Sequence, residues 1–110
     1  GALGEGDIGR HFPDSDEQYR GIASTELLRR VVELARNKGY RVGNCDVTIV
    51  AQAPKLAPYI EEMRANVARV LGVDVSRVNI KATTTERLGF EGEGLGISAQ
   101  AVAVMRSEAK

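Results

Sequence analysis

Three adjacent threonines followed by a glutamate are the residues of this chain best suited to chemistry. They lie in Lys81-Ala82-Thr83-Thr84-Thr85-Glu86-Arg87-Leu88-Gly89-Phe90, where an apolar strand pattern runs into a glycine-rich loop. Hydroxyls and backbone N–H groups can donate to anionic oxygens, and the Glu86 carboxylate can bind a divalent cation that shares those oxygens. The same residues also fit a β-branched strand end followed by a solvated turn. From their spacing alone, both interpretations stay open.

Charge and cysteine content exclude several classes of protein. The chain has 110 residues, which suits one small domain. Lys plus Arg and Asp plus Glu each total 15, so no net positive charge attracts nucleic acid or an acidic membrane. Cys45 is the only cysteine, which excludes an intrachain disulfide and a cysteine-based zinc cluster. With no apolar run of membrane-spanning length and no leader pattern, we expect a soluble cytoplasmic protein.

Two amphipathic helices are predicted to hold the strands in place. Ser24 is expected to cap the first helix, whose apolar residues follow helical spacing until Gly39 stops it. Residues Leu56 to Leu71 repeat apolar positions at the same spacing, and Gly72 closes this second helix. Each helix therefore has one apolar face with which to cover a sheet.

Three strands are predicted from alternating or continuous apolar residues. Alternation marks one strand at residues 46–51 and another at residues 78–83. The third, Ile97 to Met105, is almost continuously apolar, as expected of a strand buried on both faces. The order helix, strand, helix, strand, strand predicts a single α/β domain over residues 1–110, with helices on one face of a mixed β-sheet.

Three loops contain residues that neither helix nor strand formation explains: Asp7 to Asp16, Ala51 to Ala57, and Thr83 to Phe90. Pro13 and the neighbouring aspartates are expected to keep residues 10–19 out of regular structure. Polar or conformationally restricted residues at such places are typical of binding loops on a rigid scaffold.

Together, these loops resemble one family, the 2-C-methyl-D-erythritol 2,4-cyclodiphosphate synthases of the non-mevalonate isoprenoid pathway. The matching segments are Gly6-Asp7-Ile8-Gly9-Arg10-His11-Phe12-Pro13-Asp14, then Asp46-Val47-Thr48-Ile49 running into Ala51-Gln52-Ala53-Pro54-Lys55-Leu56, and Lys81 through Phe90. Because the matches occur in order and span almost the whole chain, they are more specific than a lone glycine pattern.

The resemblance implies a homotrimer of subunits with a ferredoxin-like arrangement and active sites between neighbours. It implies an intramolecular reaction in which the 2-phosphate of 4-diphosphocytidyl-2-C-methyl-D-erythritol 2-phosphate attacks the β-phosphorus of the diphosphate. CMP leaves and 2-C-methyl-D-erythritol 2,4-cyclodiphosphate forms. Such a reaction gains mainly from positioning and from cations that spread the developing charge. The expected location is the cytoplasm, or the plastid stroma of a plastid-bearing eukaryote.

The resemblance also implies residue roles. Thr84 would stabilise the transition state, and Glu86 would bind the Mg²⁺ or Mn²⁺ that bridges the substrate phosphates. The nucleotide would contact Ala51, Gln52, Ala53, Pro54, Lys55, Leu56, Ala57, Thr83, Thr84, Thr85 and Phe90. The methylerythritol end would contact Asp7, Ile8, Gly9, Phe12, Pro13, Asp14, Ser15 and Asp16. Asp14 and Asp16 also fit a loop that caps its own backbone, and both roles can hold at once.

The zinc site of the family has no match among these residues. Its Asp-x-His motif and later histidine would lie upstream of this chain, so Zn²⁺ ligands are expected from a missing N-terminal portion. His11 alone makes a poor metal site. We therefore expect the chain by itself to be inactive. The competing interpretations are a non-catalytic ferredoxin-like module that binds a nucleotide or a protein, and an inactive fragment of the synthase.

Overall fold

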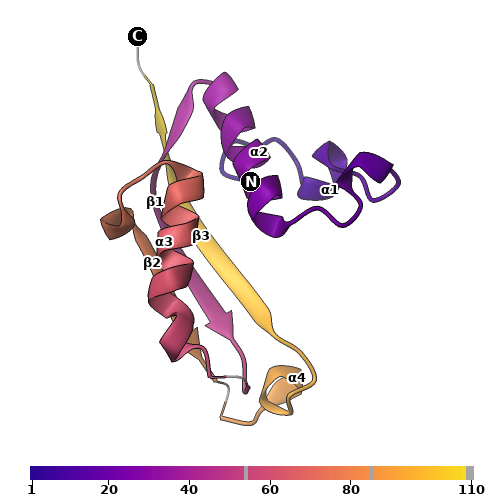
Figure 1. The fold of residues 1–110 in the computed structure, drawn as a ribbon, viewed down its shortest axis with the longest axis vertical. Coiled ribbons are helices and arrows are strands. Elements are labelled where there is room, and N and C mark those ends of the chain that lie inside the picture. Colours follow the sequence, from indigo (N-terminus) through magenta and orange to yellow (C-terminus); the bar gives the residue numbers. More distant parts are fainter. Residues whose placement is uncertain (54, 85, 109–110) are drawn as a thin grey trace.

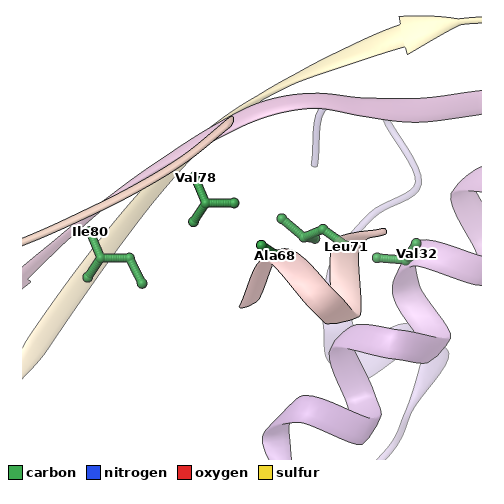
Figure 2. Close-up of a cluster of buried hydrophobic side chains, with 5 residues drawn as sticks. All are labelled: Val32, Ala68, Leu71, Val78 and Ile80. Atoms are coloured by element: carbon green, nitrogen blue, oxygen red, sulfur yellow. The ribbon is translucent and has the colours of Figure 1, made fainter. Parts of the chain in front are cut away.

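One mixed sheet organises the computed structural model, which describes residues 1–53, 55–84 and 86–108. Its three strands lie in the order β2-β1-β3. The central strand β1 (Tyr40–Val50) pairs in parallel with β2 (Val78–Thr83) and antiparallel with β3 (Ser98–Ser107). Figure 1 shows α3 (Ile60–Leu71) over one face of this sheet, and Figure 2 shows Val32 of α2 (Ser24–Asn37) on the same side as α3. The predicted α/β class with helices on one face is confirmed.

A helical crossover joins the two parallel strands. The 3-10 turn η2 (Ala57–Tyr59) leads into α3 (Ile60–Leu71), and a further 3-10 turn, η3 (Val75–Arg77), precedes β2. Gly72 ends α3 in the left-handed conformation, at φ 73°, and its N–H donates to the Ala68 carbonyl oxygen at 2.9 Å. Glycine adopts this conformation without the Cβ clash of other residues, so the predicted helix stop is confirmed.

The core lies between the sheet and its two main helices, α2 (Ser24–Asn37) and α3. Figure 2 shows Val78 and Ile80 pointing from β2 toward Ala68 and Leu71 of α3, with Val32 of α2 beside them. Val78 is 1% exposed, which makes the start of β2 the most deeply buried point of this cluster. The crossover helix therefore fixes β2 against β1 and determines where both strands end.

The N-terminal segment contains more regular structure than expected. Its elements are the single-turn helix α1 (Ile8–His11) and the 3-10 turn η1 (Glu17–Tyr19). The prediction that residues 10–19 lack regular structure is wrong, because Asp16 accepts a hydrogen bond from the Gln18 N–H and starts η1. The glycine-rich loop likewise contains a short helix, α4 (Gly89–Gly92).

Three predictions about the longer elements need correction. Ser24 is the first residue of α2 rather than its cap, and the cap position, Ala23, makes no side-chain hydrogen bond. Strand β1 begins at Tyr40, well before the predicted start at Asp46. The third strand is not buried on both faces: Val102 is 70% exposed and Val104 is 52% exposed. It lies at the edge of the described sheet, where an apolar sequence does not guarantee cover.

The ferredoxin-like arrangement needs a fourth strand, so it stays a prediction, as does the homotrimer. No helix among the described residues is long and apolar enough to cross a membrane.

Candidate functional site

Two of the predicted loops begin side by side. The Ala51 N–H donates to the Thr83 carbonyl oxygen at 3.0 Å, and Val50 is the register partner of Thr83 across the parallel strands. The loops that follow β1 and β2 therefore leave the sheet at the same end, where both strands have their carboxyl ends. In open α/β sheets, ligands bind at the carboxyl ends of the strands. The fold thus brings together the predicted nucleotide residues that lie about thirty positions apart in the sequence.

The Thr84 hydroxyl organises the loop after β2. Its Oγ1 accepts a hydrogen bond from the Glu86 N–H at 3.2 Å, while the Thr83 hydroxyl donates to the Thr84 carbonyl oxygen at 3.2 Å. Because Oγ1 of Thr84 acts here as an acceptor, its own hydrogen can still be donated to an anionic oxygen. The side chains of Thr83, Thr84 and Glu86 are all exposed, so a ligand can reach this end of the sheet.

The backbone of this loop adopts a conformation that is costly for residues with side chains. Glu86 has φ 54° and Arg87 has φ 69°. Non-glycine residues in this left-handed region cost roughly 1–3 kcal/mol each and cluster at ligand sites. The turn held by Thr84 therefore fixes the Glu86 backbone just beyond the strand end. Sequence patterns do not reveal such a turn, because it contains no glycine at Glu86 or Arg87.

The loop after β1 supplies a partly buried wall and an exposed cation. Ala51 is 7% exposed, Leu56 is half-buried, and Ala53, Lys55 and Ala57 are exposed. Oε1 of Gln52 is buried without a hydrogen-bond partner in the part of the chain that the structure describes. Such an atom is costly to leave unpaired, and a ligand amine or hydroxyl would satisfy it. Pro54, Thr85 and the Phe90 side chain, all predicted to contact the nucleotide, lie outside the described part of the structure.

An ion pair joins β1 and β2 on the sheet face opposite the core, and it engages Lys81, the first residue of the threonine motif. Nζ of Lys81 lies 2.7 Å from Oδ2 of Asp46, and Nδ2 of Asn79 donates to Oδ1 of Asp46 at 3.0 Å. Hydrogen bonds from Lys81 and Asn79, with the charge of Lys81, hold the pKa of Asp46 below its usual range. Sequence reasoning missed this pair, although the spacing of Asn79 and Lys81 places both on one face of a strand.

The donor atoms at the strand ends suit a hard divalent cation but not zinc. Glu86 offers carboxylate oxygens and the threonines offer hydroxyls, the ligand type that Mg²⁺ and Mn²⁺ take together with substrate phosphates. Among residues 1–53, 55–84 and 86–108, no group of three or more His, Cys, Asp or Glu side chains could hold a metal ion. His11 instead donates from Nε2 to the Glu5 carbonyl oxygen at 2.7 Å.

The third predicted loop lies elsewhere in the subunit. Oδ1 of Asp7 accepts from the Arg10 N–H at 2.9 Å, and Asp16 caps η1, so both aspartates cap their own backbone. Asp14 and Ser15 are exposed, Gly9 is exposed in α1, and Pro13 is half-buried. Ile8 and Phe12 line a cavity of about 610 Å³ formed with α2 and β3. In Figure 1, α1 lies beside α2 and away from α4, so one subunit does not bring this segment to the strand ends.

These features define an α/β protein with an oxygen-rich site at the carboxyl ends of two parallel strands. The sequence profile of the YgbB family matches residues 1–106, and the chain belongs to this family. It is 62% identical over 109 residues to a protein of Syntrophotalea carbinolica named 2-C-methyl-D-erythritol 2,4-cyclodiphosphate synthase, a match that covers 99% of this chain and 66% of the relative. The family predicted from the loop motifs is confirmed.

Solved structures agree with this assignment. The bifunctional IspDF from Campylobacter jejuni is 40% identical with a TM-score of 0.88, over 96% of this chain and 28% of that protein. IspF of Plasmodium falciparum, solved as a CDP complex, is 34% identical with a TM-score of 0.79, over 96% of this chain and 62% of that protein. The chain spans about two thirds of the length of the curated relative, at 66%.

Proposed function

We propose that this chain carries the nucleotide-binding part of a cyclodiphosphate synthase site. The reaction is the cyclisation of 4-diphosphocytidyl-2-C-methyl-D-erythritol 2-phosphate, in which a phosphate oxygen bonds to the β-phosphorus and the bond from that phosphorus to the CMP oxygen breaks. The observation that carries the proposal is the hydrogen bond from the Ala51 N–H to the Thr83 carbonyl oxygen, at 3.0 Å. It joins the two loops that the nucleotide would contact.

Each loop contributes a different part of the binding. The loop from Ala51 to Ala57 encloses the cytosine, with Gln52 Oε1 as an available acceptor and Lys55 as an exposed cation. Thr84 donates its hydroxyl hydrogen to the diphosphate oxygens, and Thr83, whose own hydroxyl hydrogen goes to the Thr84 carbonyl oxygen, lies beside them. Glu86 holds a Mg²⁺ or Mn²⁺ ion, which when bound neutralises negative charge on the phosphates. The CDP complex of the Plasmodium falciparum protein, at 34% identity, supports a cytidine diphosphate ligand.

The methylerythritol end is assigned to the segment from Asp7 to Asp16. Because α1 packs beside α2 and away from the strand ends in Figure 1, this segment would reach the nucleotide of a neighbouring subunit. The homotrimer therefore belongs to the proposal, and so does a zinc ion with ligands from outside this chain. Asp14, exposed beyond Pro13, is the proposed acceptor for substrate hydroxyls.

Nucleotide binding is the first test, because it does not require the complete active site. We expect calorimetry to show that the chain binds CDP more tightly with Mg²⁺ than without it, and that Glu86→Gln removes this difference. Glu62→Gln, which changes an exposed glutamate on α3, is the matched control and should bind as the wild type does. CDP affinity that is indifferent to Mg²⁺ and to Glu86→Gln would show that the metal assignment is wrong.

Turnover is tested by CMP release from the cytidyl substrate, with and without Zn²⁺ and Mg²⁺. We predict that the chain alone does not release CMP, and the same assay checks this prediction. Measurable CMP release that is equal in the wild type and in Glu86→Ala would exclude the metal role of Glu86. The non-catalytic module is the competing function, and the synthase name of the Syntrophotalea carbinolica relative favours the enzyme.

A further inference from the structure

A second cavity, of about 710 Å³, lies at the opposite end of the sheet from the candidate nucleotide site. It is bounded by the start of β1, the end of β3 and the segments that follow α2 and α3. The 11 residues of β1 separate the two ends by roughly 35 Å at about 3.3 Å per residue. The charged residues that line this cavity are Arg36, Arg41, Arg77, Arg106, Asp74 and Glu108.

Both carboxylates of this lining already have partners. Oε1 of Glu108 lies 3.2 Å from Nε of Arg41. Oδ2 of Asp74 accepts from the Ser76 N–H at 2.9 Å, and hydrogen bonds from Ser76, with a smaller effect of the Arg77 charge, hold the pKa of Asp74 below its usual range. Two negative groups therefore face four arginines, and the formal charge of the lining is positive.

Three of the arginines lie close to backbone at the cavity, and Arg77 also donates a hydrogen bond to it. Within the described ranges, Arg36, Arg77 and Arg106 form no ion pair. Arg77 Nη1 donates to the Gly43 carbonyl oxygen at 3.5 Å, and a Cβ at Gly43 would lie 3.2 Å from Cγ of Arg106. A Cβ at Gly72 would lie 2.5 Å from Nη2 of Arg36. The absence of side chains at the two glycines lets these arginines approach the backbone.

A purely structural role explains only part of this arrangement. Arg36 lies in the last turn of α2, where a cation complements the helix dipole. Arg77 lies in η3 and Arg106 lies in β3, so neither is explained by that helix end. Like charges around one cavity repel each other unless an anion occupies it. Guanidinium groups bind phosphate oxygens in a bidentate manner, which suits a compact anion carrying several negative charges.

We propose that this cavity binds a small polyphosphate anion of the diphosphate class, at a site separate from the nucleotide loops. Arg36, Arg77 and Arg106 supply the guanidinium donors. Arg41 borders the site but stays paired with Glu108. The inference is independent of the proposed function, because none of these residues contributes to the loops after β1 and β2.

The test is a titration of the full chain with sodium diphosphate, without divalent cations, followed by nitrogen-15 NMR. We expect saturable shifts of the Gly43 and Gly72 amides. Arg36→Gln, Arg77→Gln and Arg106→Gln should each weaken binding about tenfold, the loss typical of one charged hydrogen bond. Arg29→Gln is the matched control, since Arg29 lies on α2 but pairs with Glu26 outside the cavity, and it should bind unchanged.

A second arm separates free diphosphate from the diphosphate group of a nucleotide. Saturating CDP should leave the diphosphate shifts of Gly43 and Gly72 in place. Four outcomes would each overturn the proposal. They are displacement of diphosphate by CDP, shifts confined to residues 83–86, binding that does not saturate, and equal affinity of all the variants. Arg106→Lys keeps the charge and loses the planar fork, so it should fold and bind with intermediate affinity. Wild-type affinity in this variant would also contradict bidentate binding.

Discussion

Lys81 on β2 reaches across the parallel strand pair to Asp46 on β1, with Nζ 2.8 Å from Oδ1 and 2.7 Å from Oδ2. Both side chains are 51% exposed, so solvent and salt screen their attraction. The pair nevertheless joins the two strands whose ends form the candidate nucleotide site. It links the stability of this part of the sheet to pH.

Asp46→Asn is expected to lower the melting temperature slightly at pH 7. Hydrogen bonds from Lys81 and, to a smaller extent, from Asn79 lower the pKa of Asp46 in the folded chain. The carboxylate therefore stabilises the fold at pH values above its unfolded pKa of about 3.9. This contribution is lost as the pH falls through the lower folded pKa. The difference between variant and wild type should therefore shrink in melting curves recorded from pH 7 down to pH 3. A difference that grows with acidity would contradict the assignment, and added salt should reduce it at pH 7.

The Cys45 thiol is expected to react slowly. Burial, and then the neighbouring Asp46 charge, raise its pKa. Because the thiolate is the nucleophile, the midpoint of the alkylation rate against pH should lie above the value of about 8.5 for a free thiol. Asp46→Asn should move the midpoint down, whereas Glu33→Gln, on the exposed side of α2, should leave it unchanged. A midpoint at or below about 8.5 under iodoacetamide would show that the thiol is not shielded.

Arg64 is expected to be the most important charged residue for stability. It donates from Nε to the Val78 carbonyl oxygen at 2.8 Å and from Nη2 to the Val75 carbonyl oxygen at 3.0 Å, which ties α3 to the start of β2. Arg64→Met removes both hydrogen bonds at the start of β2 and should lower the free energy of unfolding by about 1–3 kcal/mol. Urea denaturation measures the loss. Arg69→Met, which removes only a hydrogen bond to Asn66 on the same helix, is the control, and equal losses in both variants would refute the special role of Arg64.

The sequence predicted the loops that leave β1 and β2 better than it predicted the extent and exposure of the strands, while the roles of the site residues stay predictions. The threonine motif and the loop after β1 are local patterns, and a parallel crossover must bring their strand ends together. The exposure of β3 was not predictable in this way, because its alternating Ala and Val residues look the same at an edge as in a buried strand. The left-handed Glu86 and Arg87 were also missed, since neither residue type favours that conformation.

The arginine cavity shows another limit of sequence reasoning. Arg36, Arg77 and Arg106 come from three elements that are far apart in the chain, and each resembles an ordinary surface residue when taken alone. Arg77 and Arg106 both approach Gly43, where the register between β1 and β3 shifts. A charge pattern along the sequence carries no information about such a meeting point.

Thr84 gives the sharpest prediction for the nucleotide site. Its Oγ1 accepts from the Glu86 N–H, so Thr84→Val removes both the support of the Glu86 turn and a donor to the ligand while keeping the side-chain shape. We expect CDP affinity in the presence of Mg²⁺ to fall about tenfold, as for the loss of one charged hydrogen bond. Thr84→Ser retains the hydroxyl and should bind within a factor of about three, given the usual scatter of such contacts.

The Glu86 amide separates the two effects of this substitution. If Thr84 holds the turn, hydrogen exchange at the Glu86 amide should be faster in Thr84→Val than in the wild type, without any ligand present. Thr25→Val, which changes an exposed threonine in the first turn of α2, should alter neither exchange nor CDP affinity. Faster exchange with unchanged affinity would restrict Thr84 to supporting the loop. Because a donor to the diphosphate must affect binding itself, that result would remove Thr84 from the set of residues proposed to contact the substrate.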